Sequence, residues 1–118
     1  MIEKVQNVFY RVADLDRSIA FYGDVIGLKL KFRDGSKWAE FDAGNVSLGL
    51  ELLEGQGTAG AGGGVVVLRG PGLDELLERV RSAGYAQIGE IDQRPYGRIA
   101  RFADPDGNEV NYLEPKPK

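Results

Sequence analysis

The sequence predicts an α+β fold made of two repeated β-α-β-β-β modules, and three observations support this prediction. Apolar residues alternate as in strands over much of the chain, and two segments instead show helical spacing. These segments follow one another as strand, helix, strand, strand, strand, and this order occurs twice. The two halves also share short sequence motifs: Leu15-Asp16 matches Leu73-Asp74, and Gly44-Asn45 matches Gly107-Asn108. Repetition at half the chain length indicates a duplicated unit.

The first module begins with a predicted strand over Val5–Val12, which alternates and is rich in β-formers. Asp14 or Asp16 can cap the helix that follows, and Gly27 suits the position after its end. The apolar stripe of this helix consists of Leu15, Ile19, Tyr22 and Ile26. Turn signals at Asp34-Gly35 and Ala43-Gly44-Asn45 separate three further strands, which are expected at Leu28–Arg33, Lys37–Asp42 and Val46–Leu52.

The second module repeats this order from a β-branched strand at Val65–Arg69. Pro71-Gly72 interrupts the strand, and a helical stripe follows that ends at Gly84. The stripe consists of Leu73, Leu76, Leu77 and Val80. Three shorter strands are expected after it, at Ala86–Asp92, Arg98–Ala103 and Glu109–Leu113.

We expect residues 1–118 to form a single domain. The first module then covers 1–54, a glycine-rich linker 55–64, the second module 65–114, and a disordered tail 115–118. The linker contains six glycines in ten residues, which makes it costly to order. A phosphate-binding loop would need a helix directly after it, and a strand follows instead.

Composition excludes several classes of function. The formal net charge is −3 and no run of Lys and Arg exceeds two residues, so neither nucleic acid nor a membrane is an expected partner. No apolar run is long enough to span a bilayer and no signal peptide is apparent, so the cytoplasm is the expected location. The chain has no Cys and no His, which removes thiolate chemistry and the commonest transition-metal ligand.

Three motifs resemble the vicinal-oxygen-chelate superfamily, proteins of the glyoxalase and bleomycin-resistance type. They are the run from Val12 to Tyr22 (VADLDRSIAFY), Ile26-Gly27-Leu28, and the turn Asp104-Pro105-Asp106-Gly107-Asn108. The likeness covers nearly the whole chain in the right order and spacing. It implies that the two modules form a curled mixed sheet around a cleft and that the chain forms a homodimer. It does not imply a particular reaction, because a fold is not a function.

The resemblance also implies where a metal would be held. Metal-using relatives place imidazoles and carboxylates at the equivalents of Asn7, Val65, one residue of the fourth strand and Asn111. The fourth-strand residue is Glu51 or Gly49, and Glu109 lies two residues before Asn111. Neutral amides with one carboxylate are a poor site for Ni, Fe, Mn or Zn, so we expect no metal and no other cofactor.

Strand alternation assigns side chains to the face that would line the cleft. Candidate ligand-binding residues on this face are Asn7, Phe9, Arg11, Trp38, Glu40 and Glu51 in the first module. In the second module they are Val65, Val67, Arg69, Ile99, Arg101 and Asn111.

Each candidate also has a structural interpretation. Glu40 and Glu51 are equally well explained as solvated charges on a strand. Arg11 and Arg69 can clamp an anion or pair with these carboxylates, and pairing is slightly favoured. Asn7 and Asn111 can hydrogen-bond to each other, and Trp38 can stack on a ligand or fill a dimer interface.

Two functions compete. In the first, the protein is metal-free and binds a small apolar or aromatic molecule, as antibiotic-sequestering members of the family do. In the second, it is an isomerase or lyase acting on a small carbonyl substrate, with Glu51 or Glu40 as the base and an Arg at the developing oxyanion. The sequence favours binding, because the ligands for ordinary metal-dependent catalysis are missing.

Overall fold

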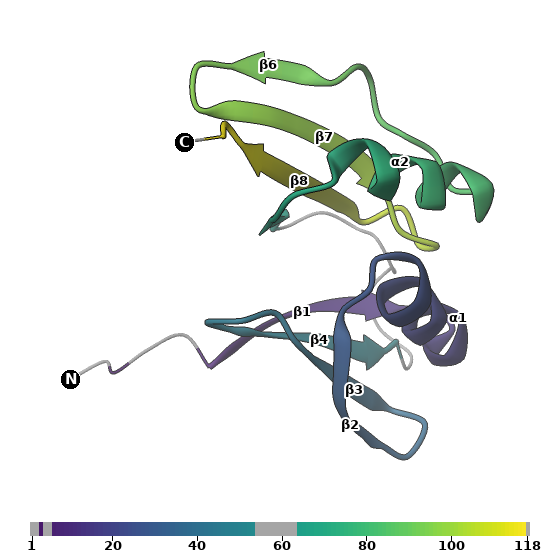
Figure 1. The fold of residues 1–118 in the computed structure, drawn as a ribbon. Coiled ribbons are helices and arrows are strands. Elements are labelled where there is room, and N and C mark those ends of the chain that lie inside the picture. The colour runs from purple at the N-terminus through teal and green to yellow at the C-terminus, as the bar shows by residue number, and fades with distance from the viewer. Residues whose placement is uncertain (1–2, 4–5, 54–63, 118) are drawn as a thin grey trace. The chain divides into compact units, whose positions relative to one another are not determined.

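The computed structural model describes residues 3, 6–53 and 64–117, and the chain divides into two compact units, Met1–Ala61 and Gly62–Lys118. Within the described residues, each unit holds a four-stranded mixed sheet with a helix packed on it (Figure 1). The strand order is β1-β4-β3-β2 in the first sheet and β5-β8-β7-β6 in the second. The predicted α+β class and the repeated β-α-β-β-β module are confirmed.

The first sheet consists of β1 (Asn7–Val12), β2 (Lys29–Asp34), β3 (Trp38–Asp42) and β4 (Ser47–Leu52). β1 runs parallel to β4, and the other two pairings are antiparallel. The predicted hairpin joins β2 to β3, where Gly35 has a φ of 56° and the Lys37 N–H donates to the Asp34 carbonyl at 3.3 Å. These strands lie within two residues of their predicted positions.

The predicted helix of the first unit consists of α1 (Leu15–Ala20) and a π-helical turn, η1 (Phe21–Val25). Asp14 is the N-cap, and its Oδ1 accepts from the Arg17 N–H at 3.0 Å. In η1 the Ile26 N–H donates to the Phe21 carbonyl, five residues back, at 2.9 Å. The predicted helix therefore ends in a π-helical turn, and Leu15, Tyr22 and Ile26 of its predicted stripe are buried.

The core of the first unit lies between α1 and the sheet. α1 packs against β3 and β4, and the sheet contributes Tyr10, Val12, Ala39, Phe41, Leu48 and Leu50, all buried. Burying each large apolar side chain stabilises the unit by about 1.5–3 kcal/mol. The strands therefore present alternate residues to the helix, and this fixes which residues point the other way.

The second unit contains β5 (Val66–Arg69), α2 (Leu73–Ser82), β6 (Asp92–Arg94), β7 (Gly97–Ala103) and β8 (Glu109–Pro115). α2 packs against β7 and β8. The predicted stripe of this helix is buried, together with Ala100, Phe102 and Val110 of the sheet. β5 is parallel to β8, and the remaining pairs are antiparallel.

The predicted strand at Ala86–Asp92 is wrong. This segment makes only an isolated bridge between Gln87 and Phe102, and β6 begins at Asp92. Gly89 has a φ of 64°, a left-handed conformation that interrupts an extended strand.

The predicted disordered tail at 115–118 is also wrong in part. Pro115 belongs to β8, and the Lys116 N–H donates to the Tyr96 carbonyl at 3.0 Å. The predicted linker at 55–64 lies outside the described residues except for Gly64. In the described ranges, no helix is both long and apolar enough to cross a membrane.

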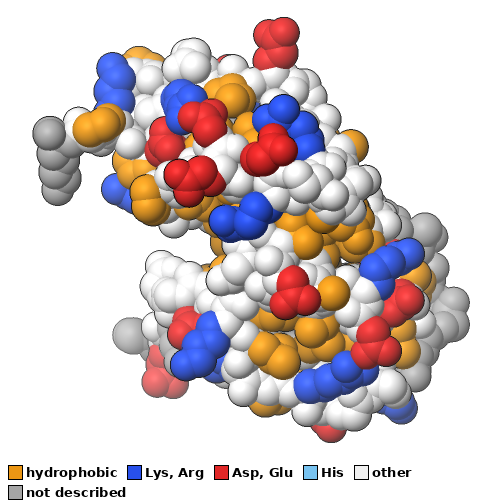
Figure 2. Space-filling view, turned by 45° about the vertical axis from the view of Figure 1, so that its right-hand side comes forward, with side chains coloured by type: hydrophobic (Ala, Val, Ile, Leu, Met, Phe, Trp, Pro, Cys, Tyr) orange, Lys and Arg blue, Asp and Glu red, His pale blue; other side chains and the backbone are white. Residues whose placement is uncertain are grey.

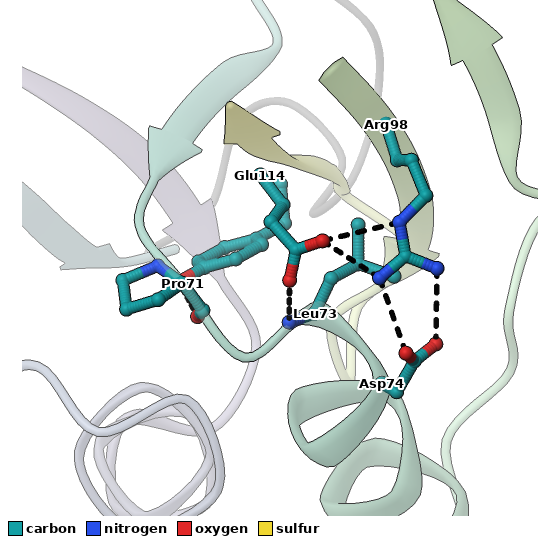
Figure 3. Close-up of polar contacts among 6 residues, drawn as sticks. Pro71, Leu73, Asp74, Arg98 and Glu114 are labelled. Atoms are coloured by element: carbon teal, nitrogen blue, oxygen red, sulfur yellow. Dashed lines mark hydrogen bonds and ion pairs between the residues drawn. The ribbon is translucent and has the colours of Figure 1, made fainter. Parts of the chain in front are cut away.

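A carboxylate from β8 caps the N-terminus of α2 (Figure 3). The N-cap position is Gly72, which has no side chain to do so. Instead Glu114 Oε2 accepts from the Leu73 N–H at 2.9 Å, and its Oε1 accepts from Arg98 Nη2 at 2.7 Å. Arg98 also donates to both oxygens of Asp74 in the first turn of α2. The Leu73 N–H and the Arg98 guanidinium lower the pKa of the Glu114 carboxyl below its ordinary value.

We predict that Glu114→Gln destabilises the fold at neutral pH and that this effect fades in acid. Because the folded pKa of Glu114 is lowered, its contribution is complete above the ordinary carboxyl range and is lost as pH falls through the folded pKa. Denaturant unfolding of both proteins from pH 7 to pH 3 measures the difference. Glu90→Gln, an exposed loop carboxylate, is the control. A difference between wild type and Glu114→Gln that stays constant over this range would contradict the assignment.

Candidate functional site

The face of the first sheet opposite α1, called here the open face, carries all six candidate residues of the first module. Across β1, β4 and β3 the register aligns Arg11 with Glu51 and Trp38, and aligns Phe9 with Gly49 and Glu40. Asn7 lies in the next row beside Ser47. The opposite face is the helix side, because Arg33, the partner of Ala39, forms an ion pair with Asp16 of α1 at 2.6 Å.

Two aromatic rings lie against each other across the middle of this open face. The ring centroids of Phe9 and Trp38 are 5.6 Å apart with an interplanar angle of 62°, an edge-to-face contact. Gly49 makes this contact possible, because a Cβ there would clash with Cη2 and with Cζ2, at 2.5 Å, of the Trp38 indole. Phe9 is 41% exposed, so the ring pair presents apolar surface to solvent. We call Phe9 and Trp38 the aromatic platform.

A polar cluster around Glu40 borders the aromatic platform. Glu40 is only 8% exposed, so it is not the solvated strand charge that one interpretation of the sequence expected. Its Oε1 accepts from Trp38 Nε1 at 3.3 Å, and its Oε2 lies 3.5 Å from Lys31 Nζ. Lys31 Nζ also donates to Ser47 Oγ at 2.9 Å. The buried carboxylate is thus balanced by a cation whose side chain is still half-exposed.

Lys31 and Phe32 are not among the residues predicted from the sequence, and a β-bulge in β2 brings both to the open face. Leu30 pairs with Phe41 and Phe32 pairs with Glu40, so Lys31 is the extra residue between them. The extra residue lets Lys31 reach Glu40 and Ser47 while Phe32 lies on the same face. Strict alternation would have placed Lys31 and Phe32 on opposite faces.

In the sheet register, Arg11 and Lys31 lie on opposite sides of the aromatic platform. Its guanidinium carbon is 5.7 Å from the centroid of the Phe9 ring, within cation–π range. Its Nε donates to Glu51 Oε1 at 3.3 Å. Of the two alternatives for Arg11, an anion clamp or a pair with a carboxylate, the structure contains the pair. Both side chains are largely exposed, so the pair contributes at most about 1 kcal/mol.

The open face of the second sheet carries the candidates of the second module. The register aligns Val67 with Asn111 and Arg101, and aligns Arg69 with Leu113 and Ile99. Val65 is exposed and precedes β5. Arg101 Nη2 donates to Asp92 Oδ2 at 2.9 Å. This face is aliphatic and cationic, whereas the first has aromatic rings.

The residues present do not fit a transition-metal site. Of the positions that the family resemblance assigns to metal ligands, Asn7 and Asn111 offer neutral amides and Val65 offers no donor. Among the described residues, no three His, Cys, Asp or Glu side chains lie close enough to share a metal ion.

Charges of both signs alternate on the face that Figure 2 draws. On the face drawn in Figure 2, hydrophobic side chains lie in patches between Lys or Arg and Asp or Glu side chains. The pairs Arg11–Glu51 and Lys31–Glu40 follow the same pattern on the open face of the first sheet. Such a surface does not attract one charge type over a long range.

We predict that Gly49→Ala destabilises the protein by about 1–3 kcal/mol, as over-packing of a filled site does. The added methyl group must displace the Trp38 indole and separate it from Phe9. Denaturant unfolding measures the loss, and near-ultraviolet circular dichroism reports the indole's environment. Gly64→Ala is the control, because a Cβ there meets nothing within 4 Å. An unchanged indole spectrum in Gly49→Ala would contradict the contact.

Comparisons with known proteins agree with this architecture. Residues 4–112 match the model of the glyoxalase/bleomycin resistance protein/dioxygenase superfamily. The crystal structure of TnmS3, an antibiotic binding protein from Streptomyces sp. CB03234, is 28% identical, with a TM-score of 0.79 and coverage of 98% of both chains. A lactoylglutathione lyase of Haemophilus influenzae is 30% identical over 96% of this chain and 93% of its own. A probable lactoylglutathione lyase of Synechocystis sp. is 28% identical over 92% of each.

The family match spans nearly the whole chain, and the duplicated module that predicted it is present in the structure. The chain belongs to the glyoxalase/bleomycin resistance protein/dioxygenase superfamily.

Proposed function

We propose that the protein binds a small, flat, apolar or aromatic molecule on the open face of its first sheet, without a metal. The aromatic platform carries this proposal. Phe9 and Trp38 form an exposed apolar surface. This surface requires glycine at position 49, because a Cβ there would clash with the Trp38 indole. Exposed apolar surface with a polar rim is typical of ligand sites.

The polar groups around the platform supply anchors for such a ligand. Lys31 lies on one side and Arg11 on the other, and each has N–H donors beyond those that bind Glu40, Ser47 and Glu51. The carboxylates are engaged by these cations. A ligand with oxygen or nitrogen acceptors at its edges is therefore favoured over one with a cationic group.

The likeness to an antibiotic binding protein supports a role in sequestration. TnmS3 shares the fold and 28% of the residues over nearly the full length of both chains. We propose that the ligand here is of the same general kind, an aromatic natural product that the protein sequesters without altering it.

A neutral flat probe tests the platform. N-phenyl-1-naphthylamine should bind to the wild type. Both Phe9→Ala and Trp38→Ala should weaken binding about tenfold, because each variant loses a stacking contact with the probe that contributes about 1.5 kcal/mol. Fluorescence of the probe measures the affinity. Tyr96→Ala, which removes an exposed aromatic ring from the second unit, should leave it unchanged. Equal affinity in wild type and Trp38→Ala would contradict the proposed site.

The alternative function is an isomerase or lyase acting on a small carbonyl compound. It is favoured by the buried Glu40 next to a cation, and by two relatives described as lactoylglutathione lyases. Glu40 or Glu51 would move the proton, and Lys31 or Arg11 would stabilise the developing oxyanion.

Conversion of methylglyoxal and glutathione to lactoylglutathione by the wild type tests this alternative. If Glu40 is the base, Glu40→Gln should lower kcat about 100-fold or more with little change in KM, while Glu51→Gln stays near wild type. The reverse pattern would assign the base to Glu51. No turnover by the wild type, with or without added divalent metal, would exclude the lyase.

A further inference from the structure

Glu40 is a carboxylate that the packing of the first sheet shields from solvent. It lies on β3 two residues after Trp38, so both side chains project from the open face. Only 8% of Glu40 is exposed. Glutamate side chains are seldom so completely buried unless they are paired, so the contacts of this carboxylate require an explanation.

The Trp38 indole occupies the space above a glycine that lies opposite Glu40. Glu40 pairs with Gly49 across β3 and β4 in the register. A Cβ on Gly49 would clash with Cη2 and with Cζ2, at 2.5 Å, of the indole, so the six-membered ring of Trp38 lies over Gly49. The N–H edge of the indole is then beside the carboxylate, and Nε1 donates to Glu40 Oε1 at 3.3 Å.

The hydrogen bond to Glu40 distinguishes this orientation of the indole from the flipped one. The contacts of the indole with Gly49 and Phe9 are apolar and give the N–H group no preferred direction. The χ2 torsion of tryptophan is broad and roughly two-fold, so a flipped ring is accessible to the isolated side chain. The indole has one donor, Nε1–H, and flipping the ring would remove this donor from Glu40. The carboxylate therefore selects one of the two orientations.

Lys31 and Ser47 hold the carboxylate in turn. Glu40 Oε2 lies 3.5 Å from Lys31 Nζ, and the same Nζ donates to Ser47 Oγ at 2.9 Å. Lys31 is the bulged residue of β2, so the cation, the carboxylate and the hydroxyl come from three strands. Hydrogen bonds that a carboxylate accepts are stronger than those between neutral groups. This network fixes Glu40 on the sheet and leaves its Oε1 to the indole.

We propose that Glu40 is a positioning residue of the aromatic platform. Its carboxylate holds the Trp38 indole over Gly49, and this orientation sets the affinity of the platform for a flat ligand. The proposal rests on the proposed function, because it concerns ligand binding at the same site. It differs from the role of a base. A base loses its function when the carboxylate becomes an amide, whereas the carbonyl of a glutamine can still accept from Nε1.

The indole N–H reports on this contact directly, because Trp38 is the only tryptophan of the chain and gives one indole resonance. In NMR spectra of the ligand-free wild type, this proton should exchange with water more slowly than in an unfolded peptide. Glu40→Leu should speed the exchange about fivefold, as the loss of one hydrogen bond does, and Glu40→Gln should restore most of the protection. An unprotected proton in the wild type would overturn the proposal without any variant.

Glu51→Leu is the matched control for this readout. Glu51 is opposite Trp38 in the register, but its carboxylate accepts from Arg11. The exchange of the indole proton should be the same in this variant as in the wild type. Equal acceleration in Glu51→Leu and Glu40→Leu would overturn the assignment to Glu40.

The affinity for N-phenyl-1-naphthylamine tests the consequence for binding. Glu40→Leu should weaken binding about fivefold, and Glu40→Gln should stay within about twofold of the wild type. In a Trp38→Phe background, which keeps a ring but has no N–H donor, Glu40→Leu should have no further effect. Equal weakening by Glu40→Leu in both backgrounds, or no rescue by Glu40→Gln, would overturn the proposal.

The two readouts separate this proposal from the proposed function. Binding that depends on Trp38 but not on Glu40 would overturn the positioning role alone and leave the proposed function standing. Failure of the wild type to bind the probe would overturn the proposed function, and with it the effect of Glu40 on affinity. The exchange of the indole proton would still decide whether Glu40 holds the ring.

Discussion

Each sheet is packed against its helix on one face, and side chains on a strand alternate between faces. Tyr10 and Val12 pack toward α1, which directs Phe9 and Arg11 to the open face. Phe102 and Val110 are buried in the second core, and this directs Arg101 and Asn111 away from it. The helix-facing residues make a similar apolar core in both modules. The open faces do not pack against a helix, so their side chains are not constrained to form that core. There the modules differ, with aromatic rings in the first and aliphatic and arginine side chains in the second.

The Leu-Asp motif that both modules share forms a similar ion pair in each module, but the two helix N-termini are capped differently. Asp16 binds Arg33 of β2, and Asp74 binds Arg98 of β7, so each aspartate ties the first turn of its helix to a strand of its own sheet. The caps differ. Asp14 caps α1 from the neighbouring residue, whereas α2 begins after Gly72 and depends on Glu114, which is distant in sequence. The N-terminus of α1 is therefore capped by a residue next to it in the sequence, whereas the cap of α2 forms only when β8 is in place.

Sequence alone predicted what depends on local periodicity and turn chemistry. The order of elements along the chain, both hairpin turns of the first module and the face of Phe9 and Trp38 follow from alternation and from residues such as Asp34-Gly35. The bulge at Lys31 could not be predicted, because it depends on pairing with β3, and the polar and apolar residues of β2 alternate in the sequence as if no bulge were present. The segment before β6 alternates like a strand, yet Gly89 takes a left-handed conformation and pairing begins only at Asp92. The Glu114 cap joins residues about forty positions apart and has no local signal.

The donor groups on the open faces differ from those that hold a divalent metal ion. An amide at the position of Asn7 or Asn111 cannot supply the negative charge that a divalent cation requires, but it can donate or accept a hydrogen bond. The acidic groups around these positions are already bound by cations, as in Lys31–Glu40, Arg11–Glu51 and Arg101–Asp92. In each pair the carboxylate is engaged, while the cation keeps donors that its partner does not use. These free donors are the groups that the ligand proposed for the first sheet would use, the opposite of the chemistry of a carboxylate-rich metal site.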